Sequence, residues 1–211
     1  MAAERGCADP EGSDVFQTRI HGRGGQGVVT AAELLAVAAF RAGKHAQAFP
    51  SFGSERTGAP VVAYCRIDDK LIRMREPVLV PDALIIQDAT LLTQVDLFSG
   101  LPHDAYVLVN TSKTFDELGL ADLVAAHRAD RLHTVPATEI AMEFLGRPLP
   151  NAVLLGGFAA FTEEVSLAGV TEAIVERFAG ALGEANVAAA TAAYESVMVR
   201  RSEEYVDAPA D

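Results

Sequence analysis

The chain has 211 residues, half of them hydrophobic, so it can bury a sizeable core as a folded unit. Its formal net charge is -12 and its basic residues form no run longer than two, which argues against nucleic acid as a partner. The longest apolar stretch, residues 152–161, is too short to span a bilayer, so we expect a cytoplasmic protein without a membrane partner.

Residues 1–14 are polar and acidic and have no apolar signal segment, so we expect a flexible arm ahead of one domain at residues 15–205. The two cysteines, Cys7 and Cys65, are too few for an iron–sulfur cluster or a structural zinc site. We therefore expect reduced thiols and no metal bound by this chain.

The first predicted elements are a strand at residues 16–20 and a helix at 26–42, joined by a turn crowded with glycine. We call residues 22–27 the glycine turn; it consists of Gly22, Arg23, Gly24, Gly25, Gln26 and Gly27. A helix start offers unpaired backbone N–H groups and partial positive charge, and glycines let an anion approach the backbone. With Arg23 as an added cation, the turn is predicted to hold a negatively charged group such as a phosphate.

Further along, the pattern predicts a strand at 46–49, a loop at 50–60 and a hairpin of strands 61–67 and 71–74. Strands and helices then alternate, and the chain closes with three helices. The later strands are predicted at residues 83–87, 105–110 and 131–135, and the helices at 90–98, 116–127, 138–145, 151–161, 170–182 and 184–200. This order predicts an α/β three-layer sandwich with a mostly parallel, mixed sheet and helices on both faces.

In such sheets, ligands bind beyond the carboxyl ends of the strands. The glycine turn and the 50–60 loop follow two of these ends, so Ser54, Glu55 and Arg56 are candidates to share a binding rim with Arg23. The alternative is a solvated turn in which Glu55 and Arg56 are only surface charges.

Gly22, Gly24 and Gly27 also fit the spacing of a dinucleotide-binding fingerprint. Such a site usually has a carboxylate at the end of the second strand, but residues 44–50 contain none, and Glu55 lies beyond the strand in the loop. Two alternatives stay open: a free-standing Rossmann-like oxidoreductase that binds NAD or flavin, and a turn that only packs the helix tightly on the sheet.

Residues 19–35 and 45–60, followed by Gln87 and Asp88, resemble the gamma subunit of pyruvate:ferredoxin oxidoreductase, in the 2-oxoacid:acceptor oxidoreductase family. The resemblance covers residues 16–200. It implies a multi-subunit enzyme that converts a 2-oxoacid and coenzyme A to an acyl-coenzyme A and reduces ferredoxin, with pyruvate as the favoured substrate.

The resemblance also implies that thiamine diphosphate, magnesium and the iron–sulfur clusters are held by partner subunits of alpha, beta and delta type, or by fused equivalents. This chain would then bind no cofactor alone and supply no catalytic residue, and its role would be to position coenzyme A as co-substrate and to support assembly. His21, next to the turn, is expected to make a structural hydrogen bond and not to act in catalysis.

Overall fold

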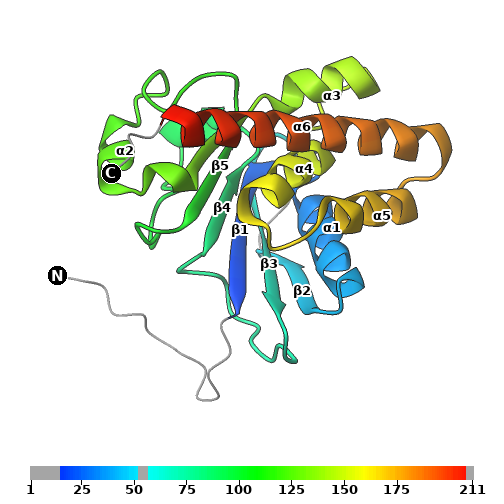
Figure 1. Ribbon diagram of the computed structural model, residues 1–211. Helices are drawn as coiled ribbons and strands as arrows, with labels where there is room; N and C mark the ends of the chain where they lie inside the picture. Colours follow the sequence, from blue (N-terminus) through cyan, green and yellow to red (C-terminus); the bar gives the residue numbers. More distant parts are fainter. Residues whose placement is uncertain (1–14, 52–56, 208–211) are drawn as a thin grey trace.

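The structure is a computed structural model that describes residues 15–51 and 57–207, with side chains described up to residue 202. Its centre is a six-stranded sheet with the strand order β2-β3-β1-β4-β5-β6 (Figure 1). The strands are β1 (Phe16–Arg23), β2 (His45–Pro50), β3 (Pro60–Asp68), β4 (Ala83–Ile86), β5 (Tyr106–Asn110) and β6 (Leu132–Val135). The α-helices are α1 (Val28–Arg41), α2 (Ala121–Ala126), α3 (Ala137–Leu145), α4 (Asn151–Thr162), α5 (Leu167–Arg177) and α6 (Gly180–Asp207).

Strand β3 makes the sheet mixed, because it pairs antiparallel with both β1 and β2. The neighbouring pairs among β1, β4, β5 and β6 are all parallel. The carboxyl ends of these four strands therefore meet at one edge of the sheet, where the glycine turn leaves β1. The predicted fold class, an α/β sandwich with a mostly parallel mixed sheet, is confirmed.

Each face of the sheet has its own apolar cluster. Ile20, Ile85 and Leu108 lie side by side in the register and belong to the larger cluster, which α1, α4, α5 and α6 cover. The alternate residues Leu84 and Val107 face the other way into a smaller cluster. That face is covered by the segments after β4 and β5, which include the short 3-10 helix Ala89–Thr93.

Two predicted elements near the middle of the chain are wrong. The return strand at 71–74 does not form, because β1 and β2 already occupy both edges of β3 and leave no free edge for a hairpin partner. The helix predicted at 90–98 shrinks to a short 3-10 helix, Ala89–Thr93, and the carbonyls of Leu97 and Ser99 accept hydrogen bonds from Arg19 instead of a helical N–H.

Two further helix predictions have misplaced limits, and glycine explains both. The helix predicted at 116–127 begins only at Ala121, because Gly119 takes a left-handed backbone conformation with φ +74°. The break predicted between the last two helices near residue 183 lies earlier, at residues 178–179, directly before Gly180, which has φ +61° and begins α6. Gly183 instead lies inside α6.

The remaining general predictions concern membranes, metals and cysteines. No helix in residues 15–51 and 57–207 is long and apolar enough to cross a membrane. In the same residues, no group of three or more His, Cys, Asp or Glu side chains could hold a metal ion. Cys65 is a free, buried thiol whose pKa is raised by burial. Cys7 and the predicted arm at 1–14 lie outside the described residues.

Candidate functional site

The glycine turn connects the carboxyl end of β1 to the start of α1. Gly22 and Arg23 still belong to β1, since they pair with Val61 and Pro60 of β3. The change of direction falls on Gly25 and Gly27, whose φ angles of +96° and +70° are ones that L side chains rarely adopt. The sequence therefore folds into a strand, a turn and a helix as predicted, with the turn proper shorter than expected.

The start of α1 is open. Gly27 is its N-cap residue, and among the described residues no side chain caps the helix. The first helical hydrogen bond runs from the N–H of Ala31 to the carbonyl of Gly27, at 2.9 Å, so the preceding N–H groups have no helical acceptor. A side chain added at exposed Gly25 would meet no described atom within 4 Å. The turn thus offers bare amides and space for an anion.

A second helix begins beside the same turn. A Cβ added at Gly27 would lie 2.5 Å from Nδ2 of Asn151, the first residue of the buried helix α4. The amino-terminal ends of α1 and α4 are therefore neighbours, and their partial positive charges add at one place. Sequence reasoning placed Asn151 at the start of a predicted helix but missed its position beside the glycine turn.

Gln87, directly after β4, lies beside Gly22 of the glycine turn. Its side chain is buried, and neither amide atom has a hydrogen-bond partner in the described part of the chain. Its Oε1 is 3.1 Å from the position that a Cβ of Gly22 would take. A buried amide without a partner is costly, so its place here favours a polar group of a ligand or water as the missing partner.

Arg23 was predicted as a cation for the ligand, but described acceptors already engage its guanidinium. Its Nε lies 3.1 Å from Oδ2 of Asp88, and its Nη1 donates to the carbonyl of Gly58 at 3.0 Å. Its Nη2 donates to Oγ1 of Thr90 at 2.6 Å and to Oε1 of Gln94 at 2.9 Å. Arg23 therefore joins the turn to β4 and to the segment at Gly58.

Gln26 and Asp88 complete this network. The amide of Gln26 accepts from the N–H of Arg23 and donates to Oδ2 of Asp88, each at 2.8 Å. Burial alone favours the neutral form of the Asp88 carboxyl, but hydrogen bonds from Thr90 and Gln26 and the charge of Arg23 outweigh it, so the pKa of Asp88 is lowered. The Asp88 carboxylate is thus ionised at neutral pH and balances the charge of Arg23.

The 50–60 loop was predicted to reach the same rim. Its last residues do: the N–H of Gly24 donates to the carbonyl of Ala59 at 2.9 Å, and the N–H of Gly58 donates to the carbonyl of Gly24 at 3.0 Å. Ser54, Glu55 and Arg56 themselves lie outside the described residues. Their predicted part in the site therefore stays a prediction.

Comparison with known proteins identifies the family. The family model described as pyruvate ferredoxin/flavodoxin oxidoreductase matches residues 17–196. The chain belongs to this family. The pyruvate synthase subunit PorC of Methanothermobacter marburgensis is 48% identical over 183 residues, which cover 87% of this chain and 98% of that protein.

Two further relatives agree with this assignment. The pyruvate/ketoisovalerate oxidoreductases common subunit gamma of Thermococcus kodakarensis is 48% identical and covers 88% of this chain and 98% of its own length. The crystal structure of the pyruvate oxidoreductase subunit PORC of Thermotoga maritima has a TM-score of 0.72 at 36% identity, over 86% of this chain and 96% of that one. The resemblance to gamma subunits predicted from the sequence is confirmed.

His21 lies in β1, next to the glycine turn. Its side chain is on the opposite face of the sheet from α1, because the neighbouring Ile20 belongs to the apolar cluster that α1 covers. Its ring is buried, and Nε2 has no hydrogen-bond partner among the described residues, so the predicted structural hydrogen bond is not made by this atom. Burial, together with the charge of Arg19, lowers the pKa of His21 to about 4. The imidazole is therefore neutral at pH 7.

This neutral histidine predicts how stability depends on pH. Between the ordinary pKa of 6.5 and the folded value of about 4, unfolded His21 binds a proton that the folded protein does not. The free energy of unfolding should therefore fall as the pH drops through this window, by about 1 kcal/mol per pH unit for each such group. Buried His133, whose pKa is also lowered to about 4, adds to the effect.

Urea unfolding of the chain between pH 7 and pH 4 measures this slope. His21→Gln should reduce it, whereas the same substitution at the exposed His103 should leave it unchanged. An unreduced slope in the His21 variant would contradict a buried, neutral imidazole.

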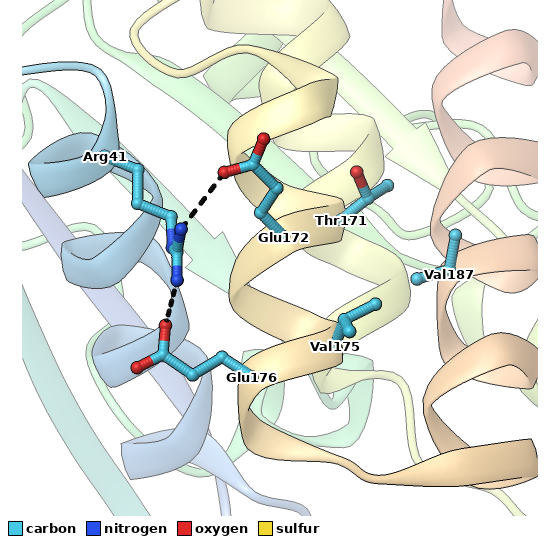
Figure 2. Close-up of a pocket in the computed structure, with 6 residues that line it drawn as sticks. All are labelled: Arg41, Thr171, Glu172, Val175, Glu176 and Val187. Carbon is cyan, nitrogen blue, oxygen red and sulfur yellow. Dashed lines mark hydrogen bonds and ion pairs between the residues drawn. The ribbon is translucent and has the colours of Figure 1, made fainter.

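A separate cavity of about 560 Å³ lies at the other end of α1, between α5 and α6 (Figure 2). Arg41 at the end of α1 is one of its lining residues and forms ion pairs with Glu172 at 3.3 Å and Glu176 at 2.6 Å, on the side of α5 that faces α1. All three side chains are largely exposed. Because the two carboxylates already engage the arginine, this cavity favours no anion, and the glycine turn is the better candidate site.

Proposed function

We propose that this chain is the gamma subunit of a 2-oxoacid:ferredoxin oxidoreductase, with pyruvate as the favoured oxoacid, and that it holds coenzyme A at the glycine turn. In this proposal the chain works in the cytoplasm with alpha-, beta- and delta-type subunits, or fused equivalents. These partners carry thiamine diphosphate, magnesium and the iron–sulfur clusters, and ferredoxin receives the electrons. The supporting observation is the open start of α1 beside Gly25.

The residues at the turn fit the anionic part of coenzyme A. Its diphosphate needs N–H donors and positive potential, which the neighbouring starts of α1 and α4 supply together. Buried Gln87 adds an amide without a protein partner. Because Asp88 balances the charge of Arg23, the backbone amides are the main hydrogen-bond donors to the diphosphate in this proposal. Arg56 would bind a further phosphate of the coenzyme.

The chain's contribution to the reaction is positioning. When the coenzyme is bound by its diphosphate, its thiol end reaches towards a reacting centre on a partner subunit, and the reaction gains from proximity. Thiamine diphosphate on the partner supplies the decarboxylation chemistry. Near the turn, His21 is buried and Asp88 is engaged by Arg23 and Gln26, so neither is assigned a catalytic role.

The strand order speaks against the alternative of a free-standing NAD- or flavin-binding oxidoreductase. In a dinucleotide-binding unit the second strand lies next to the first and ends in a carboxylate that binds the ribose. Here the antiparallel strand β3 lies between β1 and β2, and β2 ends in Phe49 and Pro50. The glycine spacing alone does not restore that site.

Reconstitution tests the proposed function. Assembled from all its subunits, the enzyme should reduce ferredoxin with pyruvate and coenzyme A, and the same preparation without this chain should lose that activity. The isolated chain should be inactive and should bind neither NADH nor flavin. Turnover by the chain alone, or full activity without it, would contradict the proposal.

A further inference from the structure

The connection between β3 and β4 displays apolar side chains to solvent at the edge of the sheet opposite the glycine turn. Its ten central residues, 71–80, have no regular secondary structure and are called the docking segment here. Leu71, Leu79 and Val80 are 67%, 74% and 43% exposed. Such a concentration of exposed aliphatic side chains within ten residues is typical of an interaction surface.

The pairing of β1 with β3 and β4 shows where the docking segment lies. Ile67, near the end of β3, lies opposite Phe16, the first residue of β1, and Ala83 at the start of β4 lies opposite Thr18. The docking segment therefore leaves the edge where β1 begins, below β1 and β3 in Figure 1. The glycine turn lies where β1 ends, so the two features are separated by the length of the strand.

Two buried arginines fix the main chain of the docking segment. Arg66 donates from Nη2 to the carbonyl of Glu76, and Arg19 donates from Nη1 to the carbonyl of Leu79 at 3.3 Å. Among the described residues neither arginine forms an ion pair, although both are buried. A buried guanidinium needs acceptors for its N–H groups, and the carbonyls of Glu76 and Leu79 supply two of them, so these hydrogen bonds constrain the segment's backbone.

Close packing holds the same backbone from the other side. A Cβ at Gly100 would overlap the carbonyl oxygen of Leu79, so only glycine allows this approach. Val78 is buried, which anchors the segment between its two exposed neighbours Pro77 and Leu79. A backbone held in place while its apolar side chains face solvent is preorganised, and preorganisation lowers the entropic cost of binding.

We propose that the docking segment binds a partner subunit of the oxidoreductase, at a patch of that subunit that is apolar and flanked by carboxylates. The charged residues of the segment are Arg73, Arg75 and Glu76, all exposed, so it is locally positive on a chain of net charge -12. A two-fold pair of identical chains would bring the same arginines together and set two acidic bodies against each other. A partner that sets carboxylates against Arg73 and Arg75 avoids the repulsion between arginines and replaces it with attraction.

This inference rests on the proposed role as a subunit, and it is tested in the co-expressed complex. Leu79→Ser combined with Val80→Ser removes the exposed side chains but leaves the carbonyl that Arg19 binds. The control, Phe40→Ser with Val175→Ser, changes two exposed apolar residues on α1 and α5. We expect the first pair to weaken partner retention at least tenfold on dilution, and the control pair to leave it unchanged.

Three further readouts keep the test decisive. Thermal unfolding of each variant chain should match the parent; if the first pair unfolds, Leu71→Ser with Arg73→Glu replaces it. The KM for coenzyme A of the complex that remains should not change, which separates docking from the coenzyme site. The proposal would be overturned if both double variants retained the partner subunits equally well. It would also be overturned if the isolated chain formed a dimer that was lost when Leu79 and Val80 were replaced.

Discussion

Replacing Gly25 by valine is expected to raise the KM of the assembled enzyme for coenzyme A by about tenfold or more, with kcat and assembly little changed. Gly25 is the exposed residue of the turn, and nothing described lies within 4 Å of where its side chain would begin. A branched side chain there occupies the space in front of the amides of α1. It should thus weaken binding of the anion without displacing any described side chain.

The strain of the substitution needs its own control, because Gly25 has φ +96° and valine resists such angles by about 1–2 kcal/mol. Gly43, just beyond the end of α1, has φ +83°, is equally exposed and also has open space around it. Gly43→Val therefore carries the same strain at the opposite end of the helix. A tenfold rise in both variants, or in neither, would place the coenzyme elsewhere.

The largest expected effect on stability comes from Gly156→Ala. Gly156 lies in the buried helix α4, where α6 crosses so closely that an added Cβ would overlap the carbonyl oxygen of Ala190 and lie 2.6 Å from its carbon. Backbone cannot move aside as a side chain can. We expect a loss of about 3 kcal/mol or more in the free energy of unfolding, from overpacking between the two helices.

The neighbouring Gly157 is the matched control. A Cβ there would meet side-chain atoms, Cγ2 of Val135 at 3.0 Å and Cγ2 of Val197 at 3.6 Å, which can yield by small rotations. Alanine also favours the helix over glycine by about 0.5–1 kcal/mol, so Gly157→Ala should be close to neutral. Urea unfolding of both variants measures the difference, and equal stabilities would contradict the tight α4 and α6 crossing.

The part of the fold that follows from local sequence could be predicted. The strand, turn and helix at the start of the chain are specified by an apolar run, glycines and an apolar helical stripe, all within about 25 residues. The absence of a return strand at 71–74 could not be predicted locally, because it depends on β2 and β1 filling both edges of β3. The shortened helix after β4 likewise depends on Arg19, about 80 residues away in sequence.

The candidate site was predictable to the same degree. Glycines mark the turn because only they adopt the required angles, so Gly25 and Gly27 could be found from spacing. The role of Arg23 could not be found from local sequence, since its main partner, Asp88, lies 65 residues further along the chain. The approach of Asn151 to Gly27 also requires the packing of α4 against α1, which no local pattern encodes.

The most direct test of the account is a structure of the assembled oxidoreductase with coenzyme A bound. We predict that the diphosphate lies within hydrogen-bond distance of backbone N–H groups at the start of α1, beside Gly25, with Asn151 and Gln87 close by. A coenzyme ordered elsewhere in the complex, with the space next to Gly25 filled by protein side chains, would contradict the account.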